Sequence, residues 1–369
     1  MTRSLVTESE ATGRPLQVAV GRAGTRSEAA VLFPSLGEYP VYDPMAYRFM
    51  LDDERRNEHY AAAVRRHAPG RTVLDIGTGH EAVWAIESAR AGASHVYAVE
   101  VIPETAALAR KTIAEAGLAD RITLIEGLST DIELPVRAEV CVSEIIGTLG
   151  GSEGAGPVLR DARLRLLTPD GVFVPHRSAT TVVAVDLDTA FGGRRPAFAP
   201  IAVRYLDKIF GSVGRPFDLR VCVPRLNEAA FLSEIAEVES LEFNGELRPE
   251  GTDHRELRVT KSGTLHGFAL GVRLWVDENQ SPLDSFSQRT NWFPVYAPVS
   301  TAGLPVAEGD RITLEFVTRL SDDGVHPDYE LTGELEPVAG ERVPLHWRSG
   351  HHDMGFRTNG FYRELFPGD

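Results

Sequence analysis

Short apolar runs alternate with helical stretches over residues 71–176. The strand-like runs lie at 71–76, 95–99, 121–125, 138–142 and 171–174. Stretches of helical composition separate several of them, at 81–91, 103–116 and 157–167. Strands separated by helices of roughly 10–15 residues are typical of βαβ units. The pattern therefore predicts an α/β domain with a parallel sheet.

The pattern changes after Pro175. Strand-like runs follow at 180–185, 268–276 and 311–316, and helical composition becomes scarce apart from about 225–238. Upstream, residues 16–20 have strand character and residues 45–67 have helical character. A series of short strands predicts a mainly antiparallel, β-barrel-like domain. The expected domains are an N-terminal segment at 1–70, the α/β domain at 71–176 and the β-barrel-like domain at 177–369.

A glycine loop follows the first strand of the α/β domain. Asp75, Gly77 and Gly79 form the pattern D-x-G-x-G, and Glu100 lies 21 residues after Gly79 (100 − 79) at the end of the second strand. Glycines let the backbone turn sharply and approach a ligand, and the helix that follows presents free N–H groups. A carboxylate at the next strand end can accept two hydrogen bonds from a ribose diol. The spacing predicts a ligand-binding turn at the carboxyl edge of the sheet.

Two cofactor classes share this geometry, dinucleotides such as NAD and S-adenosylmethionine (SAM). A dinucleotide site expects G-x-G-x-x-G, but no third glycine follows Gly79 at the expected place. Glu81, on the first helical turn, would also repel a pyrophosphate. SAM carries no phosphate, and its sulfonium and amino groups suit acidic surroundings. We therefore favour SAM over NAD, and a glycine turn that binds nothing is the remaining alternative.

The chain is acidic, with 38 lysine and arginine residues against 53 aspartate and glutamate residues and a formal net charge of −15. This balance argues against a nucleic-acid partner, which needs a basic surface, and suits a small cation or a basic peptide. No apolar run is long enough for a membrane span, and the N-terminus lacks a signal-peptide core, so we expect a cytoplasmic protein with no membrane partner. Cys141 and Cys222 are expected to be buried free thiols.

An ordered set of motifs in residues 73–185 resembles the protein arginine methyltransferase family. The family reads V-L-D-x-G-x-G, then A-G-A-x-x-V, then a ribose-binding glutamate, and this chain has these at 73–79, at 91–96 and at Glu100. The family's adenine-contacting loop, which ends in E-L-P, corresponds to residues 126–135. The resemblance implies a Rossmann-like SAM-binding sheet in which Glu100 binds the ribose.

The most specific match is the family's double-E loop, in which S-E-x-x-G is followed by a second glutamate nine residues after the first. This chain has the two glutamates at Glu144 and Glu153, and the family's L-x-P-D-G-x-x-x-P follows at 167–175. In the family these glutamates hold an arginine guanidinium and align one nitrogen with the methyl group of SAM. Such catalysis rests on positioning and charge. By this resemblance Glu144 and Glu153 are the expected catalytic residues.

The resemblance also assigns the residues that would hold SAM and the acceptor. The family's M-L-x-D-x-x-R helix matches residues 50–56, so Arg56 is expected to form a bidentate pair with the SAM carboxylate. The expected cofactor-binding residues are Arg56, Asp75, Gly77, Gly79, Glu100, Val101, Leu128 and Ser129. The expected acceptor-side residues are Tyr42, Tyr47, Asn291 and Trp292. Residues 188–238 would correspond to the family's dimerisation arm, which implies a homodimer.

Two departures from the family concern the acceptor. Asn291 stands where the family's T-H-W loop has a histidine that pairs with the helix aspartate, here Asp53. The segment between Glu144 and Glu153 is rich in glycine and lacks the family's aromatic residues. We therefore expect a small-molecule acceptor, an indole carbon or a guanidine-type nitrogen, as in indole C3-methyltransferase-like relatives of secondary metabolism, with Trp292 as a stacking surface. The alternatives are a protein arginine N-methyltransferase, an NAD-dependent oxidoreductase and a degenerate SAM-binding scaffold.

The C-terminal part contains a histidine cluster. His351 and His352 are followed by Asp353, and His346 lies shortly before them. Adjacent histidines on a strand would point to opposite faces. Methyl transfer from SAM needs no metal, so we predict that the chain holds none.

Overall fold

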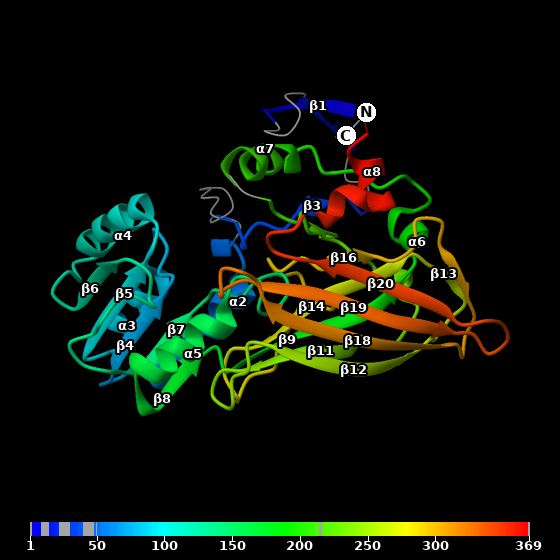
Figure 1. The fold of residues 1–369 in the computed structure, drawn as a ribbon. Coiled ribbons are helices and arrows are strands. Elements are labelled where there is room, and N and C mark those ends of the chain that lie inside the picture. The colour runs from blue at the N-terminus through cyan, green and yellow to red at the C-terminus, as the bar shows by residue number, and fades with distance from the viewer. Residues whose placement is uncertain are drawn as a thin grey trace.

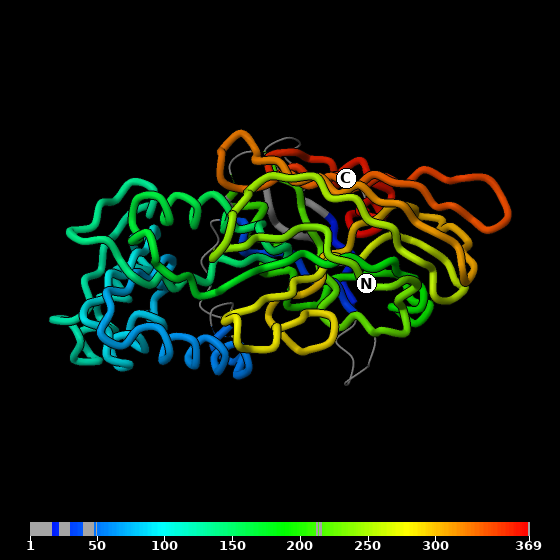
Figure 2. The backbone as a smooth tube through the Cα atoms, turned by 90° about the horizontal axis from the view of Figure 1, so that it is seen from below, coloured from blue at the N-terminus to red at the C-terminus, as the bar shows by residue number. Residues whose placement is uncertain are grey.

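The computed structural model describes residues 2–8, 15–21, 30–39, 48, 50–213 and 216–367. A five-stranded parallel sheet with its helices forms one part, and an antiparallel β part lies beside it (Figure 1). The view from below shows the same two parts next to each other (Figure 2). This confirms the predicted fold class, a Rossmann-like sheet followed by a β-barrel-like region.

Strand β4 lies at the centre of the parallel sheet. The strand order is β6-β5-β4-β7-β8, and all neighbouring strands are parallel. The chain first adds strands on one side of β4 and then crosses to the other side, which leaves a topological switch point at the carboxyl end of β4. The strands are β4 (Thr72–Ile76), β5 (His95–Glu100), β6 (Ile122–Glu126), β7 (Ala138–Ser143) and β8 (Leu167–Val174).

Four helices accompany this sheet. The first of them, α2, begins at Glu54 because the Asp53 side chain accepts a hydrogen bond from the Arg56 backbone N–H and caps the helix. The helix packs against α3 and β8, which brings the N-terminal part of the chain to the parallel sheet. The helices are α2 (Glu54–His67), α3 (Val83–Arg90), α4 (Pro103–Glu115) and α5 (Ala155–Arg165).

The antiparallel part has two main sheets that share one core. One has the order β11-β9-β14-β16-β10-β3 with β15 paired to β14, and the other has the order β12-β18-β19-β20. Phe268 on β14, Phe316 on β18 and Leu331 on β19 belong to one buried cluster, so both sheets cover the same interior. The strands are β3 (Phe33–Pro34), β9 (Arg177–Val185), β10 (Val221–Cys222), β11 (Ala236–Glu242), β12 (Gly251–Arg258), β13 (Gly263–Leu265), β14 (Gly267–Trp275), β15 (Leu283–Asp284), β16 (Val295–Pro298), β17 (Leu304–Val306), β18 (Arg311–Leu320), β19 (Pro327–Glu336) and β20 (Val343–Ser349).

Residues 188–238, expected to be a dimerisation arm, pack against other parts of their own chain. Phe198 and Leu206 lie in one buried cluster with Val18 and Phe366. Helices α7 and α8 consequently lie on the same side of the β part (Figure 1). The elements involved are β1 (Thr2–Glu8), β2 (Pro15–Ala19), α6 (Leu187–Phe191), α7 (Ala202–Ser212), η1 (Glu228–Ala230), η2 (Gly355–Thr358) and α8 (Gly360–Leu365).

The prediction of a helix at about 225–238 is wrong. The structure has only a single 3₁₀ turn there, η1, and then strand β11, which pairs with β9 along the edge of the large sheet. Val238 and Leu241 are buried by this pairing. Tertiary pairing therefore overrides the helical composition. Among the described residues, no helix is long and apolar enough to cross a membrane.

Candidate active site

The glycine loop after β4 is held against the ends of neighbouring elements. The backbone N–H groups of Gly77 and Thr78 both donate to the Val99 carbonyl at 3.0 Å. Gly77 and Gly79 have positive φ values of 76° and 65°, which other residues rarely adopt. A Cβ at Gly77 would also lie only 3.1 Å from the Cγ2 atom of Ile145. The loop needs glycine here, and the absence of side chains leaves its backbone open to a ligand.

The turn between the glycine loop and α3 has an unusual backbone conformation. Ala82, which precedes α3, has φ 47° and is the only non-glycine residue with positive φ in the described part of the chain. Such a conformation costs about 1–2 kcal/mol for a residue with a Cβ. His80 and Glu81 form an ion pair at 3.2 Å in the same turn. The helix after the glycine loop therefore begins from a residue in the left-handed conformation.

Two carboxylates flank the loop. Asp75 is fully buried and accepts hydrogen bonds from the Thr78 hydroxyl and from the Ala85 backbone N–H. Burial raises the pKa of Asp75 to about 7, against the lowering effect of these donors. Glu100 is buried at the end of β5 and accepts from the backbone N–H groups of Gly79 at 3.0 Å and Ile102 at 2.9 Å. These bonds fix the Glu100 carboxylate beside the loop, and each of its oxygens keeps a lone pair for a further donor.

Apolar side chains are exposed just beyond Glu100. Val101 is 50% exposed and Leu128 is 53% exposed, at the carboxyl ends of β5 and β6. Ser129 beside them is buried, and its carbonyl accepts from Arg165. A flat apolar ring placed between Val101 and Leu128 would cover both side chains. Together with the Glu100 carboxylate, this edge suits a nucleoside with its ribose hydroxyls, as SAM requires.

The first glutamate of the double-E loop already binds a guanidinium. Arg56 donates from Nη1 to Oε1 of Glu144 at 2.5 Å, and the two side chains are only 3% and 10% exposed. Trp84 on α3 also donates to Glu144, and it stacks on Tyr60 with ring centroids 4.9 Å apart. Burial raises the pKa of Glu144, and Arg56 opposes this rise. Arg56, expected to hold the SAM carboxylate, therefore lies at the boundary between the cofactor side and the acceptor side.

The loop that carries Asn291 and Trp292 does lie at the site. The Asn291 backbone N–H donates to the Asp53 carboxylate at 3.1 Å, so this aspartate is held by a backbone group where the family has a histidine. The Asn291 side-chain nitrogen is buried without a hydrogen-bond partner among the described residues. The Trp292 indole is buried and donates to the Ile146 carbonyl at 2.7 Å, so it supports the double-E loop from beneath. The other two expected acceptor residues, Tyr42 and Tyr47, lie outside the described residues.

The second glutamate of the double-E loop lies among acidic groups. Glu153 is partly buried, and a Cβ at Gly37 would collide with its carboxylate. Burial, with smaller contributions from the charges of Glu38 and Glu144, raises the pKa of Glu153 to about 8. Because both neighbouring charges are negative, an ionised Glu153 needs a cation beside it.

A buried ion pair holds the N-terminal segment over this loop. Arg220 and Glu38 lie 3.4 Å apart and are 2% and 1% exposed. Ser35 donates to Glu38 at 2.7 Å and shares a hydrogen bond with Thr148 of the double-E loop at 2.8 Å. Arg220 also donates to the Ser349 hydroxyl at 2.8 Å. The segment from Ser35 to Glu38 thus connects the double-E loop to the β part.

Four residues of this site were not predicted from the sequence: Trp84, Gly37, Glu38 and Arg220. Trp84 follows the glycine loop by five residues, so its place at the start of the first helix was a usable signal. Glu38 and Arg220 are 182 residues apart, and no motif relates them. Only the folded chain brings them together.

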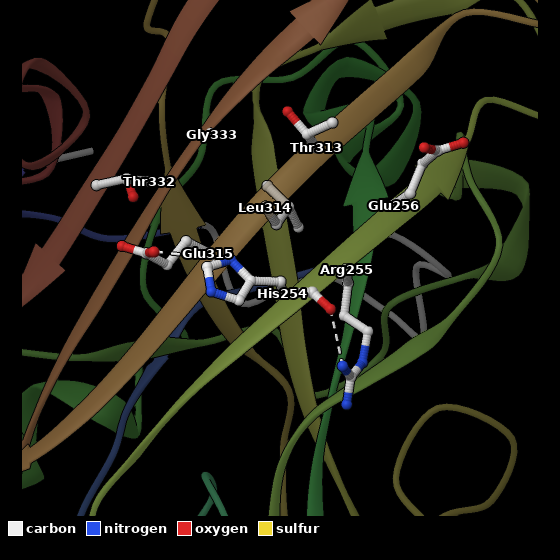
Figure 3. A pocket seen from close by; sticks show the side chains of 8 residues that line it. All are labelled: His254, Arg255, Glu256, Thr313, Leu314, Glu315, Thr332 and Gly333. Carbon is white, nitrogen blue, oxygen red and sulfur yellow. Dashed lines mark hydrogen bonds and ion pairs between the residues drawn. The ribbon is translucent and has the colours of Figure 1, made fainter.

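Two pockets lie elsewhere on the protein, and neither is lined by the residues of the double-E loop. One of about 480 Å³ lies on the outer face of β12, β18 and β19 (Figure 3), and its lining includes His254, Glu315 and Thr332. The other, of about 600 Å³, lies between β8 and the segments 244–245 and 276–278. In the first, His254 and Glu315 are exposed and only 3.6 Å apart, so they form a solvated surface pair. The buried Asp277 lines the second pocket, but its carboxylate is already paired with Arg66 and His67.

The fold and the loop geometry define a class I SAM-dependent methyltransferase. No protein-family model matches the chain. A curated relative, the arginine N(omega)-methyltransferase of Streptomyces achromogenes subsp. streptozoticus, is 30% identical over 296 residues, which cover 74% of this chain and 77% of the relative. The chain belongs to the arginine methyltransferase family, and the predicted resemblance, enzyme class and cofactor SAM are confirmed.

Two solved structures share the fold. Protein arginine methyltransferase 10 of Arabidopsis thaliana superposes with a TM-score of 0.66 at 22% identity, covering 83% of this chain and 98% of that chain. The PRMT1 enzyme–prozyme complex of Trypanosoma brucei with AdoHcy has a TM-score of 0.67 at 19% identity, covering 82% and 97%. The match extends over both the parallel sheet and the antiparallel part.

Proposed function

We propose that the protein transfers a methyl group from SAM to a guanidinium nitrogen of arginine. The proposal rests on the ion pair between Glu144 and Arg56. The Arg56 Nη1 atom lies 2.5 Å from the Glu144 Oε1 atom, so this carboxylate already binds one guanidinium. A carboxylate that accepts one guanidinium in this geometry is suited to a second, planar guanidinium with its fixed fork of donors. The name of the Streptomyces relative, arginine N(omega)-methyltransferase, supports the same acceptor.

The electrostatics of Glu153 favour a cationic acceptor over a neutral one. Its pKa is about 8, burial being the main cause, and the charges of Glu38 and Glu144 raise it further. A guanidinium placed beside Glu153 would lower this pKa and stabilise the ionised carboxylate. An indole ring brings no charge and would not stabilise the ionised form of Glu153. We therefore favour the guanidinium over the indole carbon of the initial hypothesis.

Glu144 and Glu153 would bind the guanidinium between them and restrict its rotation. SAM supplies an electrophilic methyl group on its sulfonium sulfur. The acceptor nitrogen gains this methyl and loses one proton, which a carboxylate or water takes up. Glu100 would hold the ribose, and Val101 and Leu128 would cover the adenine. The contribution of the chain is positioning and charge, and no residue needs to form a covalent bond.

The test is methyl transfer from labelled SAM to a panel of acceptors. The panel contains free L-arginine, a basic peptide with one arginine, the same peptide with lysine at that position, and an indole amino acid. We expect a mass gain of one methyl group on one or both arginine acceptors and none on the lysine peptide. Glu153→Gln should remove the activity, whereas Glu341→Gln, in the exposed turn between β19 and β20, is the matched control.

The other possible results separate the remaining hypotheses. Labelling of the indole alone would contradict the guanidinium proposal and support the indole branch. Labelling of the peptide but not of free arginine would assign a protein arginine N-methyltransferase. SAM binding without transfer to any acceptor would support a degenerate scaffold, and binding of NAD in place of SAM would contradict the cofactor assignment.

For assembly, we propose a homodimer. The Trypanosoma neighbour is a heterotetrameric complex by its own description, which supports association through this fold. Light scattering on the purified chain tests the proposal, and a monomer at all concentrations would contradict it. A cytoplasmic location also stays a proposal, which cell fractionation would test.

A further inference from the structure

Three residues with metal-binding side chains converge at one corner of the β part. Asp323 lies in the turn between β18 and β19, and His351 and His352 lie in the turn after β20. One ligand atom from each of the three lies within 4.8 Å of the other two. The histidines are not on a strand, so the alternation expected from the sequence does not separate them. The aspartate that joins them is Asp323, which is 28 residues away in the chain, and not Asp353.

The distances are close to those of a metal site. A tetrahedral zinc ion with bonds of about 2.0–2.1 Å places its ligand atoms roughly 3.3 Å apart. The His351 Nε2 and Asp323 Oδ2 atoms are already 3.7 Å apart. The widest separation within the group needs a closure of about 1.5 Å, which small side-chain rotations supply.

The Asp323 carboxylate is fixed by its own turn. Its Oδ1 atom accepts from the Ser321 hydroxyl at 2.9 Å and from the backbone N–H groups of Val325 and His326 at 2.8 and 2.9 Å. Its Oδ2 atom faces the His326 ring at 2.7 Å and His351. The oxygen that would bind a metal is therefore held in place before any metal arrives.

The two histidine rings are also oriented by neighbours. The His351 ring is buried and lies parallel to the His326 ring, with centroids 4.1 Å apart and an angle of 10°. The Tyr39 ring is also nearly parallel to it, with centroids 6.5 Å apart. His352 hydrogen-bonds to Asp322 through Nδ1. A carboxylate on one ring nitrogen is the usual partner of a metal-bound histidine, because it fixes the tautomer.

We propose that Asp323, His351 and His352 bind a divalent transition-metal ion, with zinc as the best fit. Two imidazoles and one carboxylate favour zinc or a similar first-row ion over calcium and magnesium, which prefer oxygen ligands. Because Asp323 is at the surface, water completes the fourth position. The proposal replaces the prediction from the sequence that the chain holds no metal.

The ion would connect two turns beside the acceptor site. The Asp323 turn contacts the double-E loop, because a Cβ at Gly154 would lie 2.5 Å from the Val325 Cγ1 atom. His351, in the other turn, stacks on Tyr39 of the N-terminal segment. A bound ion would therefore restrain the wall behind Glu153 and raise the resistance of the chain to unfolding.

The test uses the full chain without an affinity tag, stripped with a chelator. Calorimetry with Zn²⁺ should show one ion per chain, and Co²⁺ should give the visible absorption of a tetrahedral site. Zinc should raise the midpoint of thermal unfolding, and the chelator should reverse the rise. His352→Gln and Asp323→Asn should each weaken zinc binding about tenfold or more. His346→Gln, on the exposed face of β20 beside Glu330, is the matched control and should bind as the wild type does.

Clear results would overturn the proposal. Absence of a one-to-one zinc complex, or equal zinc affinity in wild type, His352→Gln and Asp323→Asn, would show that the cluster is only a set of histidine–aspartate ion pairs. Equal weakening by His346→Gln would show adventitious surface binding. The circular dichroism and the SAM affinity of each variant confirm that it is folded, so loss of the metal is distinguished from loss of structure.

Discussion

The glutamate at the end of the double-E loop should make the chain less stable at high pH. Its pKa is raised from an ordinary 4.5 to about 8, with burial as the main cause. Stability from the protonated group is fully present below about pH 4.5 and is lost as the pH rises through about 8. Replacing Glu153 with glutamine keeps the shape of the side chain and removes the titration.

The size of the effect follows from the difference between the two pKa values. The full difference of about 3.5 corresponds to an upper limit of about 5 kcal/mol. The isoelectric point is near pH 5.3, so the comparison is best made above that value. Between about pH 6 and pH 9, stability is lost only from pH 6 up to the pKa of about 8. This span of about 2 pH units gives an upper limit of about 3 kcal/mol. Partial exposure of Glu153 reduces this to about 1–3 kcal/mol.

The assay is urea unfolding of wild type and Glu153→Gln at both pH values without SAM or acceptor. Other titrating groups are common to both proteins, so the difference between the two free energies of unfolding isolates Glu153. We expect the variant to gain about 1–3 kcal/mol over wild type between pH 6 and pH 9. Glu341→Gln, in the exposed turn between β19 and β20, is the matched control. The charge environment described for the site would be refuted if the difference in free energy of unfolding between Glu153→Gln and wild type were the same at pH 6 and pH 9. It would also be refuted if that difference shifted in favour of wild type at pH 9.

Further predictions concern the other charged groups. Glu144→Gln should abolish turnover while SAM still binds, because Arg56 loses only one acceptor. Calorimetry tests SAM binding and single-turnover labelling tests the transfer. Unchanged rates would contradict the role of Glu144. Glu100→Ala should weaken SAM binding about 10–150-fold, since losing a charged hydrogen-bond acceptor costs about 1.5–3 kcal/mol; equal affinity would place the ribose elsewhere. Glu38→Gln should lower the free energy of unfolding by about 3–5 kcal/mol, because it leaves Arg220 buried without its partner. Adding Arg220→Met should recover part of that loss in urea unfolding, and no recovery would show that the pair is not coupled.

Local signals in the sequence account for the cofactor side of the site. Asp75, Gly77, Gly79 and Glu100 lie at strand ends, where one short motif and one spacing place them together. The parallel sheet was predictable for the same reason, since alternating strands and helices leave few arrangements. Such features depend on neighbours in the chain, and the family motifs reinforced them.

The acceptor side depends on contacts between distant segments. Gly37 and Glu38 reach Glu153 only because Arg220, from the β part, binds Glu38 at a separation of 182 residues. The helix predicted at 225–238 was wrong for a related reason, because pairing with β9 decides that segment.

The sequence by itself determined the parallel sheet, the SAM loop and the pair of glutamates, because each is set by residues close in the chain. The tertiary structure alone decided what surrounds those glutamates. It placed Arg56 on Glu144, gathered negative charge around Glu153, and joined Asp323 to His351 and His352. Burial, charge and ligand geometry are properties of side chains that meet in space, and no short motif records such meetings.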